Sequence, residues 1–237
     1  MIKKENFSKI YPKITVIIRN YNSENYIDKS IQSALNQTIS KKIYEILIVD
    51  DGSEEKSKKV LLNYKQKSSG LIRILFKEHE GSTIALNSGI KEAFGDYIII
   101  LDSDDEFKHE ILEEMLKIHQ NHDVDFVYSD YYEKGISKQE LKHVYVKDNL
   151  FFTLAAGIMF KKKDLLKFGL YNEEFILPEY DLLMKFKMSN LIGYHISKPL
   201  FIYNRREGSI TSDKKLVEKA KRQLRDKWGN GFKIRDY

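Results

Sequence analysis

Short apolar runs alternate with segments of helical periodicity along the first half of the chain. The apolar runs are rich in β-branched and aromatic residues, and Pro, Asn, Asp or Gly residues bound several of them. This pattern is typical of buried strands. We therefore predict strands at residues 14–18, 44–49, 71–76, 97–101 and 125–128.

The segments between these runs show apolar residues at helical spacing, as Ile27, Ile31 and Ala34 do after the candidate cap Ser23. Alternating helices and continuous apolar strands are typical of parallel sheets that are covered on both faces. The predicted fold class is thus α/β, with a mostly parallel central sheet flanked by helices. The helices between the strands are predicted at residues 54–67, 81–94 and 111–118.

The second half of the chain is less regular, and no internal repeat or low-complexity linker divides it. It is predicted to hold a polar loop at 133–150, a strand at 157–160 and helices at 161–168 and 178–189. Pro178 suits the first turn of the last helix. We expect an N-terminal extension over 1–12, a catalytic domain over 13–212 and a C-terminal segment over 213–237.

The C-terminal segment carries an apolar residue every fourth position, and Lys and Arg residues fill much of its remaining surface. It is predicted to form a basic amphipathic helix, with two open interpretations. Its apolar stripe packs on the main domain while the lysines face water, or the helix lies on an anionic membrane surface. The apolar positions are Leu216, Ala220, Leu224 and Trp228.

Charge and composition narrow the function classes. The net charge is +5, but residues 205–237 contain 11 Lys and Arg against 5 Asp and Glu, so the remainder is close to neutral. The main domain lacks the basic stripe with interleaved aromatics of a nucleic-acid binder.

Cysteine is absent, no apolar run reaches the ~18 residues of a membrane span, and the polar start is not a secretory signal. We expect a cytoplasmic protein, peripheral at the inner membrane face if the tail binds lipid.

Acidic residues follow two of the predicted strands, at Asp50-Asp51 and at residues 102–105. Ligands of parallel sheets bind at the carboxyl ends of strands, so both clusters should lie on one edge. In Asp102-Ser103-Asp104 both carboxylates can face one cleft, one toward a ribose and one toward a divalent cation that neutralises a diphosphate.

Each cluster has a plainer interpretation when it is taken alone. Residues 102–105 suit an acidic loop that caps the next helix, and Asp50-Asp51-Gly52-Ser53 suits a tight turn. A calcium-binding loop is excluded, because Phe107 stands where such a loop requires glycine.

Four segments decide between these interpretations when they are taken in order. Residues 15–22, 48–53, 81–90 and 95–105 together resemble the inverting glycosyltransferases of family 2, and the resemblance extends over about residues 13–212. It implies the A-type nucleotide-diphospho-sugar transferase fold. It also implies transfer of a sugar from a nucleotide-diphosphate-sugar, with a UDP-sugar as the expected donor, to an acceptor hydroxyl. The acceptor would be a glycan or a lipid-linked molecule in the biosynthesis of a cell-surface polysaccharide or glycolipid. The implied cofactor is Mn²⁺ or Mg²⁺.

The same resemblance assigns roles to the acids. Asp51 is expected to contact the donor base, Asp102 the ribose and Asp104 the metal ion. Asp105 is expected behind these residues or near the donor sugar.

Two positions on the donor side depart from the family pattern. Arg19 and Tyr21 are expected to line the nucleotide pocket, although family members commonly have proline where Arg19 stands. An arginine there would reach the diphosphate or pair with Asp51. Many members carry arginine where this chain has Leu86.

The general base is expected at the start of the helix at 178–189. The family typically has a Glu-Asp pair there, and Pro178 and Glu179 occupy these positions. A glutamate can accept the proton of the acceptor hydroxyl, so Glu179 is the first candidate and Asp181 the second. The alternative is that these acids only complement the helix dipole.

Residues 203–211 resemble the flexible family segment that closes over the donor. A cation in this segment would stabilise the leaving diphosphate, with Arg206 as the first candidate and Arg205 as the second. The alternative is an exposed basic loop.

A nucleotidyltransferase on a related fold is a further alternative, although such enzymes usually have a glycine-rich, basic loop directly after the first strand and residues 19–22 contain no glycine. The glycine motif of a dinucleotide-dependent oxidoreductase is absent at the same place. A non-catalytic nucleotide-sugar-binding relative, suggested by Pro178 and Leu86, stays open.

Overall fold

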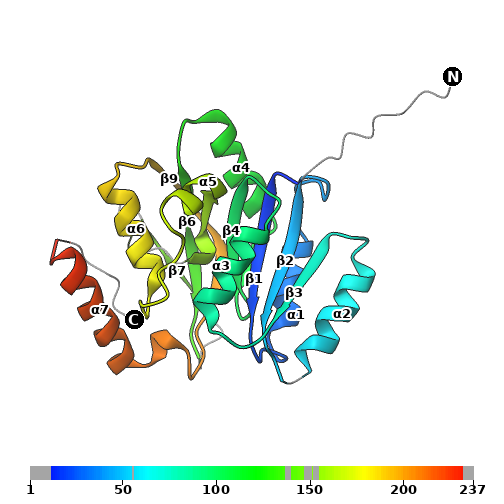
Figure 1. The fold of residues 1–237 in the computed structure, drawn as a ribbon. Coiled ribbons are helices and arrows are strands. Elements are labelled where there is room, and N and C mark those ends of the chain that lie inside the picture. The colour runs from blue at the N-terminus through cyan, green and yellow to red at the C-terminus, as the bar shows by residue number, and fades with distance from the viewer. Residues whose placement is uncertain (1–11, 55, 137–139, 147–150, 152–154, 232–237) are drawn as a thin grey trace.

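The computed structural model describes residues 12–54, 56–136, 140–146, 151 and 155–231. Its central sheet has the strand order β3-β2-β1-β4-β8-β6-β9-β5, with β7 paired to β6 (Figure 1). The strands are β1 (Ile14–Asn20), β2 (Tyr44–Asp51), β3 (Ile72–Lys77), β4 (Tyr97–Asp102), β5 (Glu106–Phe107), β6 (Phe126–Lys134), β7 (Leu141–Val144), β8 (Ile158–Lys161) and β9 (Gly193–Asn204).

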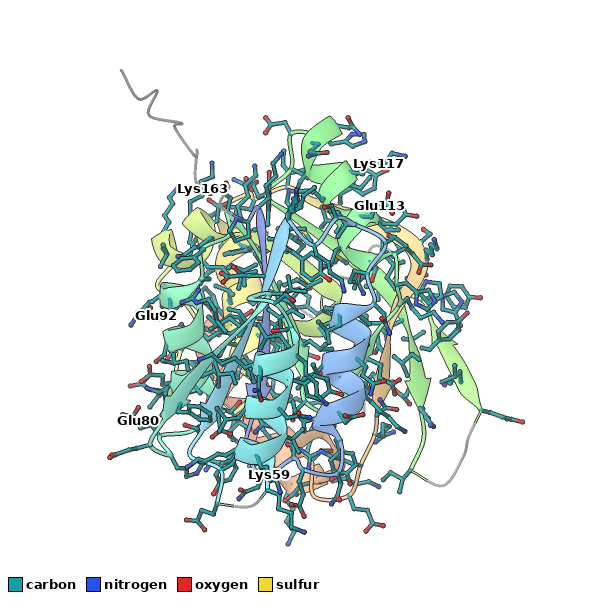
Figure 2. The ribbon with its side chains drawn as sticks, turned by 90° about the vertical axis from the view of Figure 1, so that its right-hand side faces the viewer. Lys59, Glu80, Glu92, Glu113, Lys117 and Lys163 are labelled. Atoms are coloured by element: carbon teal, nitrogen blue, oxygen red, sulfur yellow. The ribbon has the colours of Figure 1, made fainter. Side chains whose placement is uncertain are left out.

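Helices cover this sheet on both faces. In Figure 2, α1 and α3 lie on opposite sides of the strands, and charged side chains such as Glu80 and Glu92 point away from the molecule. The predicted α/β class is confirmed. The helices are α1 (Ile27–Leu35), α2 (Ser57–Lys67), α3 (Ser82–Glu92), α4 (Ile111–Asn121), α5 (Lys162–Lys167), α6 (Pro178–Met188) and α7 (Lys214–Trp228).

The strands β1, β2, β3 and β4 are parallel, and β1 lies between β2 and β4. The chain leaves β1 in one direction toward β2 and β3, and later returns on the other side to form β4. Such a reversal opens a crevice at the carboxyl ends of the strands. Gly89 lets α3 pack closely here, because an added Cβ would lie 2.8 Å from Cγ2 of Val49.

The strand register brings the polar ends of these strands together. Arg19 of β1 is paired with Asp102 of β4, and Asn20 of β1 is paired with Asp50 of β2. The predicted convergence of the two acidic clusters on one edge of the sheet is therefore confirmed.

The second half of the sheet differs from the prediction in three ways. The polar loop predicted at 133–150 is wrong at residues 133–134 and 141–144, which belong to β6 and β7, whereas residues 135–136, 140 and 145–146 lie outside helices and strands. The pairs β4–β8, β6–β8 and β6–β7 are antiparallel. The sequence pattern also gave no sign of β9, whose interior is interrupted by Lys198 and Pro199.

The C-terminal segment forms α7, which lies beside α6 at the lower left of Figure 1. Val217, Ala220 and Leu224 of its apolar stripe are buried, so the interpretation that the stripe packs on the main domain is confirmed. Among the described residues, no helix has the length and apolar character needed to cross a membrane. Almost all of the predicted N-terminal extension, and residues 232–237, lie outside the described part of the chain.

Candidate active site

A cavity of about 350 Å³ opens at the carboxyl edge of the parallel strands. The ends of β1, β2 and β4, the start of α3, the first turn of α6 and the segment after β9 line it. It therefore stands at the topological reversal between β1 and β4. Eight of the ten predicted site residues line this cavity, namely Arg19, Tyr21, Asp51, Asp102, Asp104, Asp105, Glu179 and Arg206.

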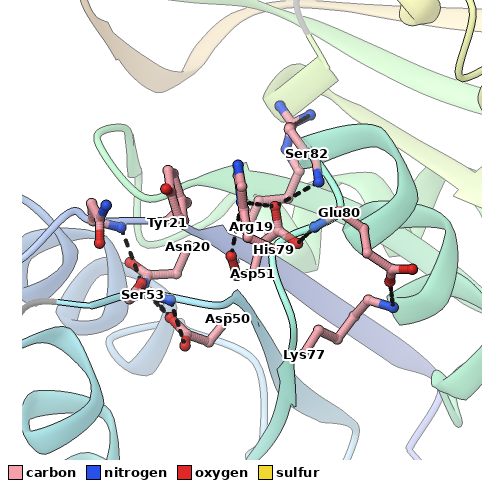
Figure 3. Close-up of polar contacts among 12 residues, drawn as sticks. Arg19, Asn20, Tyr21, Asp50, Asp51, Ser53, Lys77, His79, Glu80 and Ser82 are labelled. Atoms are coloured by element: carbon pink, nitrogen blue, oxygen red, sulfur yellow. Dashed lines mark hydrogen bonds and ion pairs between the residues drawn. The ribbon is translucent and has the colours of Figure 1, made fainter.

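A buried hydrogen-bond network fixes the ends of β1 and β2 below the cavity (Figure 3). Asn20 Nδ2 donates to Asp50 Oδ1 at 2.7 Å and to Ser53 Oγ at 3.2 Å. Ser53 Oγ in turn donates to Asp50 Oδ1 at 2.6 Å. Because Asp50 is completely buried, it anchors the turn, which leaves Asp51 as the acid of this pair that lines the cavity.

Asp51 holds the loop between β3 and α3 against the end of β2. Its Oδ1 accepts the backbone N–H of Glu80 at 3.0 Å, and its Oδ2 accepts that of Gly81 at 3.0 Å. His79 Nδ1 lies 2.9 Å from Oδ2. Carboxylate oxygens offer about four lone-pair sites, so at least one remains for a ligand donor.

Two aromatic rings stand beside Asp51. The rings of Tyr21 and His79 stack at a centroid distance of 4.0 Å and an interplanar angle of 13°. His79 thus contacts Asp51 and Tyr21, two residues that line the cavity, and no sequence spacing signals this.

Arg19 forms an ion pair with Asp102, its neighbour in the strand register. Its Nε donates to Asp102 Oδ1 at 2.6 Å, and its guanidinium also donates to Ser82 Oγ at 3.1 Å. Burial lowers the pKa of Arg19, but Asp102, together with Glu179 and Tyr171, raises it above its usual value. The sequence left two expected partners for Arg19, the diphosphate and Asp51. In the structure Arg19 pairs with Asp102 and not with Asp51.

Arg206 forms the second ion pair of the cavity, with Asp104. Asn204, which precedes it at the end of β9, donates from Nδ2 to the carbonyl of Asp104 at 2.7 Å. The backbone N–H of Asn204 donates to Asp105 Oδ1 at 2.9 Å. Asp105 therefore ties the segment after β9 to the acidic cluster, and Asp104 stands in front of it with its carboxylate toward Arg206.

The acids of the cavity outnumber its arginines. Burial and the nearby Asp102 raise the pKa of Asp104, and burial together with Asp104 and Asp102 raises the pKa of Asp105 well above its usual range. Such shifts mark a site that favours an additional cation. Hard divalent ions prefer oxygen ligands, so this acidic cluster fits Mg²⁺ or Mn²⁺. Within the described residues no three His, Asp or Glu side chains form a complete metal site, so a ligand would supply the remaining oxygens.

Glu179 lies in the first turn of α6, on the wall that faces the donor-side acids. Burial raises its pKa, Arg19 opposes this effect, and Asp102 adds to it. A carboxylate whose pKa is raised in this way is suited to accept a proton near neutral pH. Pro178 at the helix start needs no hydrogen-bond partner for its nitrogen and does not disturb the turn.

The structure does not bring the other two predicted site residues to the cavity. Asp181 is completely buried and contacts Lys227 and Trp228 of α7. Arg205 lies 3.8 Å from Glu133 of β6, outside the cavity lining. Sequence spacing did not separate Asp181 from Glu179, because both lie in one helical turn.

Two buried polar atoms beside the site have no hydrogen-bond partner within the described residues: Asn20 Oδ1 and the hydroxyl of Tyr171. The amide orientation of Asn20 follows from its bond to Asp50, which requires the NH₂ group on that side. Its oxygen is therefore left for a donor group of a ligand.

Comparisons with known proteins agree with this geometry. The model of the family described as Glycosyl transferase family 2 matches residues 15–187. The chain is 28% identical over 177 residues to the poly(ribitol-phosphate) β-N-acetylglucosaminyltransferase TarP of Staphylococcus aureus, covering 68% of this chain and 54% of that protein.

Two solved structures share the fold. The S. aureus TarS fragment 1–349 in complex with UDP-GlcNAc has a TM-score of 0.70 and 22% identity, covering 83% of this chain and 60% of that one. The mannosyltransferase PcManGT from Pyrobaculum calidifontis, in complex with GDP-Man and Mn²⁺, has a TM-score of 0.76 and 15% identity, covering 95% and 66%. The chain spans 34%, 54% and 60% of the length of three curated relatives that it matches.

Proposed function

We propose, because this chain belongs to glycosyl transferase family 2, that it transfers a sugar with inversion from a nucleotide-diphosphate-sugar to an acceptor hydroxyl. One observation carries the proposal. A single cavity holds Asp51, Asp102 and Asp104 on the wall formed by strand ends, with Glu179 on the helix wall. This arrangement separates donor binding from proton abstraction.

The nucleoside end of the donor binds between β1 and β2. Asp51 retains accepting capacity for an N–H of the base, and the exposed ring of Tyr21 offers a stacking surface. Asn20 Oδ1 is a second acceptor at this place. A UDP-sugar is the proposed donor, in line with the UDP-GlcNAc bound to TarS and the N-acetylglucosaminyl transfer in the name of TarP.

The diphosphate binds where the two arginines now neutralise acids. A phosphate group competes with Asp102 for Arg19 and with Asp104 for Arg206, because arginine binds both kinds of oxyanion. This exchange frees Asp102 for the ribose hydroxyls. Asp104 would hold Mn²⁺ or Mg²⁺, which neutralises negative charge on the leaving diphosphate when it is bound.

Glu179 acts as the general base. It takes the proton of the acceptor hydroxyl, whose oxygen attacks the anomeric carbon from the face opposite the nucleotide. The bond between the anomeric carbon and the diphosphate oxygen breaks, and its electron pair leaves with the diphosphate. Arg206 stabilises that charge. One displacement inverts the anomeric configuration without a covalent glycosyl-enzyme.

The acceptor is proposed to be a cell-surface glycan. TarP, by its name, acts on poly(ribitol-phosphate), and the putative teichuronic acid biosynthesis glycosyltransferase TuaG of Bacillus subtilis is 31% identical over 120 residues, covering 51% of this chain and 47% of that protein. The basic surface of α7 suits an anionic polymer of this kind.

A panel of nucleotide sugars, with and without Mn²⁺, tests the donor side. One nucleotide sugar should raise the melting temperature more than the others, since specific binding stabilises the folded state. Proton NMR of the product formed with that donor should show inversion at the anomeric carbon. A retained configuration would exclude the single displacement. Binding without turnover on any glycan acceptor would favour the non-catalytic relative.

A further inference from the structure

Asp181 connects the two C-terminal helices although its carboxylate is removed from water. The residue is completely buried on α6, two positions after Glu179. Its Oδ1 accepts from Lys227 Nζ at 2.7 Å and from Trp228 Nε1 at 2.8 Å. Its Oδ2 lies 3.3 Å from Lys185 Nζ. Two of these three partners belong to the last turn of α7.

A second tie joins α7 to the same wall of the cavity, on the other side of Glu179. Gln223 Oε1 accepts the backbone N–H of Ile176 at 3.1 Å, and its Nε2 donates to the carbonyl of Glu174 at 3.0 Å. Ile176 lines the cavity and stands just before α6. The segment that carries Glu179 is thus held by α7 both before and after that residue.

Aromatic and apolar contacts reinforce these ties. Lys227 Nζ also lies 5.0 Å from the ring centroid of Phe175, and Leu224 of α7 is completely buried. A buried carboxylate is strongly destabilising when a charged partner is removed, so Asp181 and α7 depend on each other. The helix α7 lies beyond residues 15–187, which the family model matches.

We infer that Asp181 is a positioning residue, which together with Gln223 and Trp228 fixes the first turn of α6 and thereby the carboxylate of Glu179. The inference rests on the proposed function of Glu179 as the base. It makes the C-terminal helix part of the catalytic apparatus. It also explains why Asp181, which shares a helical turn with Glu179, does not line the cavity. The carboxylate of Asp181 is turned toward α7.

Loss of these ties should affect the chemical step more than donor binding. A displacement of about 1 Å can lower turnover by about 100-fold. The donor-side residues Asp51 and Asp102 stand on strand ends that α7 does not hold. We therefore expect Asp181→Asn and Trp228→Phe to lower kcat by at least ~10-fold, within the range that misplacement causes. The donor Kd from calorimetry should stay within about twofold, which also reports that each variant is folded.

A double-mutant cycle with Glu179→Gln distinguishes positioning from a general structural role. If Asp181 acts through Glu179, Asp181→Asn should lower the residual turnover of Glu179→Gln by less than about twofold, because the two effects are not additive. Equal losses in both backgrounds would overturn the inference. The matched control is Asp226→Asn on the exposed surface of α7, the same chemical change outside the tie, and its kcat should equal that of the wild type.

The two proposals fail in different ways. If Glu179→Gln abolishes turnover but neither Asp181→Asn nor Trp228→Phe changes kcat, the inference is wrong and the proposed function stands. If Glu179→Gln keeps the wild-type kcat, the assignment of the base is wrong, and the positioning role falls with it. Trp228 is the single tryptophan of the chain, so a red shift of its emission in Asp181→Asn would report directly that α7 has loosened.

Discussion

Charged side chains in the cavity form two ion pairs. A bound donor would have to take the place of the acid in each pair. Arg19 with Asp102 and Arg206 with Asp104 neutralise each other across elements far apart in the sequence. Glu179 belongs to neither pair, but Arg19 is close enough to oppose the rise that burial causes in the pKa of Glu179. The electrostatics of the base thus depend on a residue of the donor wall.

The first prediction concerns the pH dependence of turnover. Burial and Asp102 raise the pKa of Glu179, and Arg19 lowers it. A base must be deprotonated, so kcat/KM should fall as the pH drops through this pKa. Arg19→Met removes the opposing charge, so the fall of kcat/KM on the acid side of the pH profile (the acid limb) should move to higher pH. Arg19→Lys keeps the charge and should leave the acid limb near its wild-type position. A limb that stays in place in Arg19→Met, or moves to lower pH, would show that Arg19 does not act on the base.

A second prediction separates the two adjacent arginines. Arg206 lines the cavity beside Asp104, whereas Arg205 lies by Glu133 on β6. Arg206→Gln should lower kcat by roughly 100-fold, the usual scale for loss of one group that stabilises a leaving charge. Arg205→Gln serves as the matched control and should change kcat by less than about threefold, because surface ion pairs contribute little. The reverse order of effects would exchange the roles of the two residues.

At the scale of elements, periodicity predicted the parallel half of the sheet well, because its strands are continuous apolar runs. It missed β7 and β9, whose residues are largely polar or interrupted by Pro199. Local pattern carries no information on pairing, so the antiparallel β8 and the long contact of β6 with β9 appear only in the structure. These missed strands matter, since the end of β9 delivers Arg206 to the cavity.

A third prediction tests the turn after β2. Gly52 has φ +77°, and an added Cβ would lie 2.7 Å from the backbone nitrogen of His79. Gly70 has a similar φ of +87° with nothing within 4 Å. Gly70→Ala should cost about 1–2 kcal/mol of unfolding free energy for its conformation alone. Gly52→Ala should cost a further 1–3 kcal/mol or so from overpacking. Urea unfolding of both variants measures the difference, and equal losses would mean that the loop yields without cost.

At the scale of the whole molecule, the sequence predicted eight residues of the cavity. The motifs that resemble the family placed most of them near a strand end or a helix start, and Arg206 in the segment at 203–211. The sequence could not predict which side chains meet. The partners Arg19 and Asp102 are 83 residues apart, and Asp104 and Arg206 are 102 apart. The position of α7 was likewise open, since an amphipathic stripe packs equally well on a protein or on a lipid surface.

A fourth prediction follows from the burial of that stripe. Trp228 donates its indole N–H to Asp181 and is the single tryptophan of the chain. Anionic phosphatidylglycerol vesicles at low salt should therefore leave its emission maximum unchanged, because the apolar stripe is already covered. Vesicles of phosphatidylcholine provide the uncharged control. A blue shift with anionic vesicles alone would mean that α7 leaves α6 and enters the membrane surface.

The central claim is that Glu179 removes the acceptor proton opposite a nucleotide-sugar held by the strand-end acids. The most direct test measures kcat for sugar transfer and the donor Kd together in wild type and Glu179→Gln. The account predicts that kcat falls by at least ~100-fold, within the usual contribution of a general base. It also predicts a donor Kd within about twofold of the wild-type value, because the substitution leaves the donor wall intact. A Glu179→Gln protein that transfers sugar at the wild-type rate would contradict it.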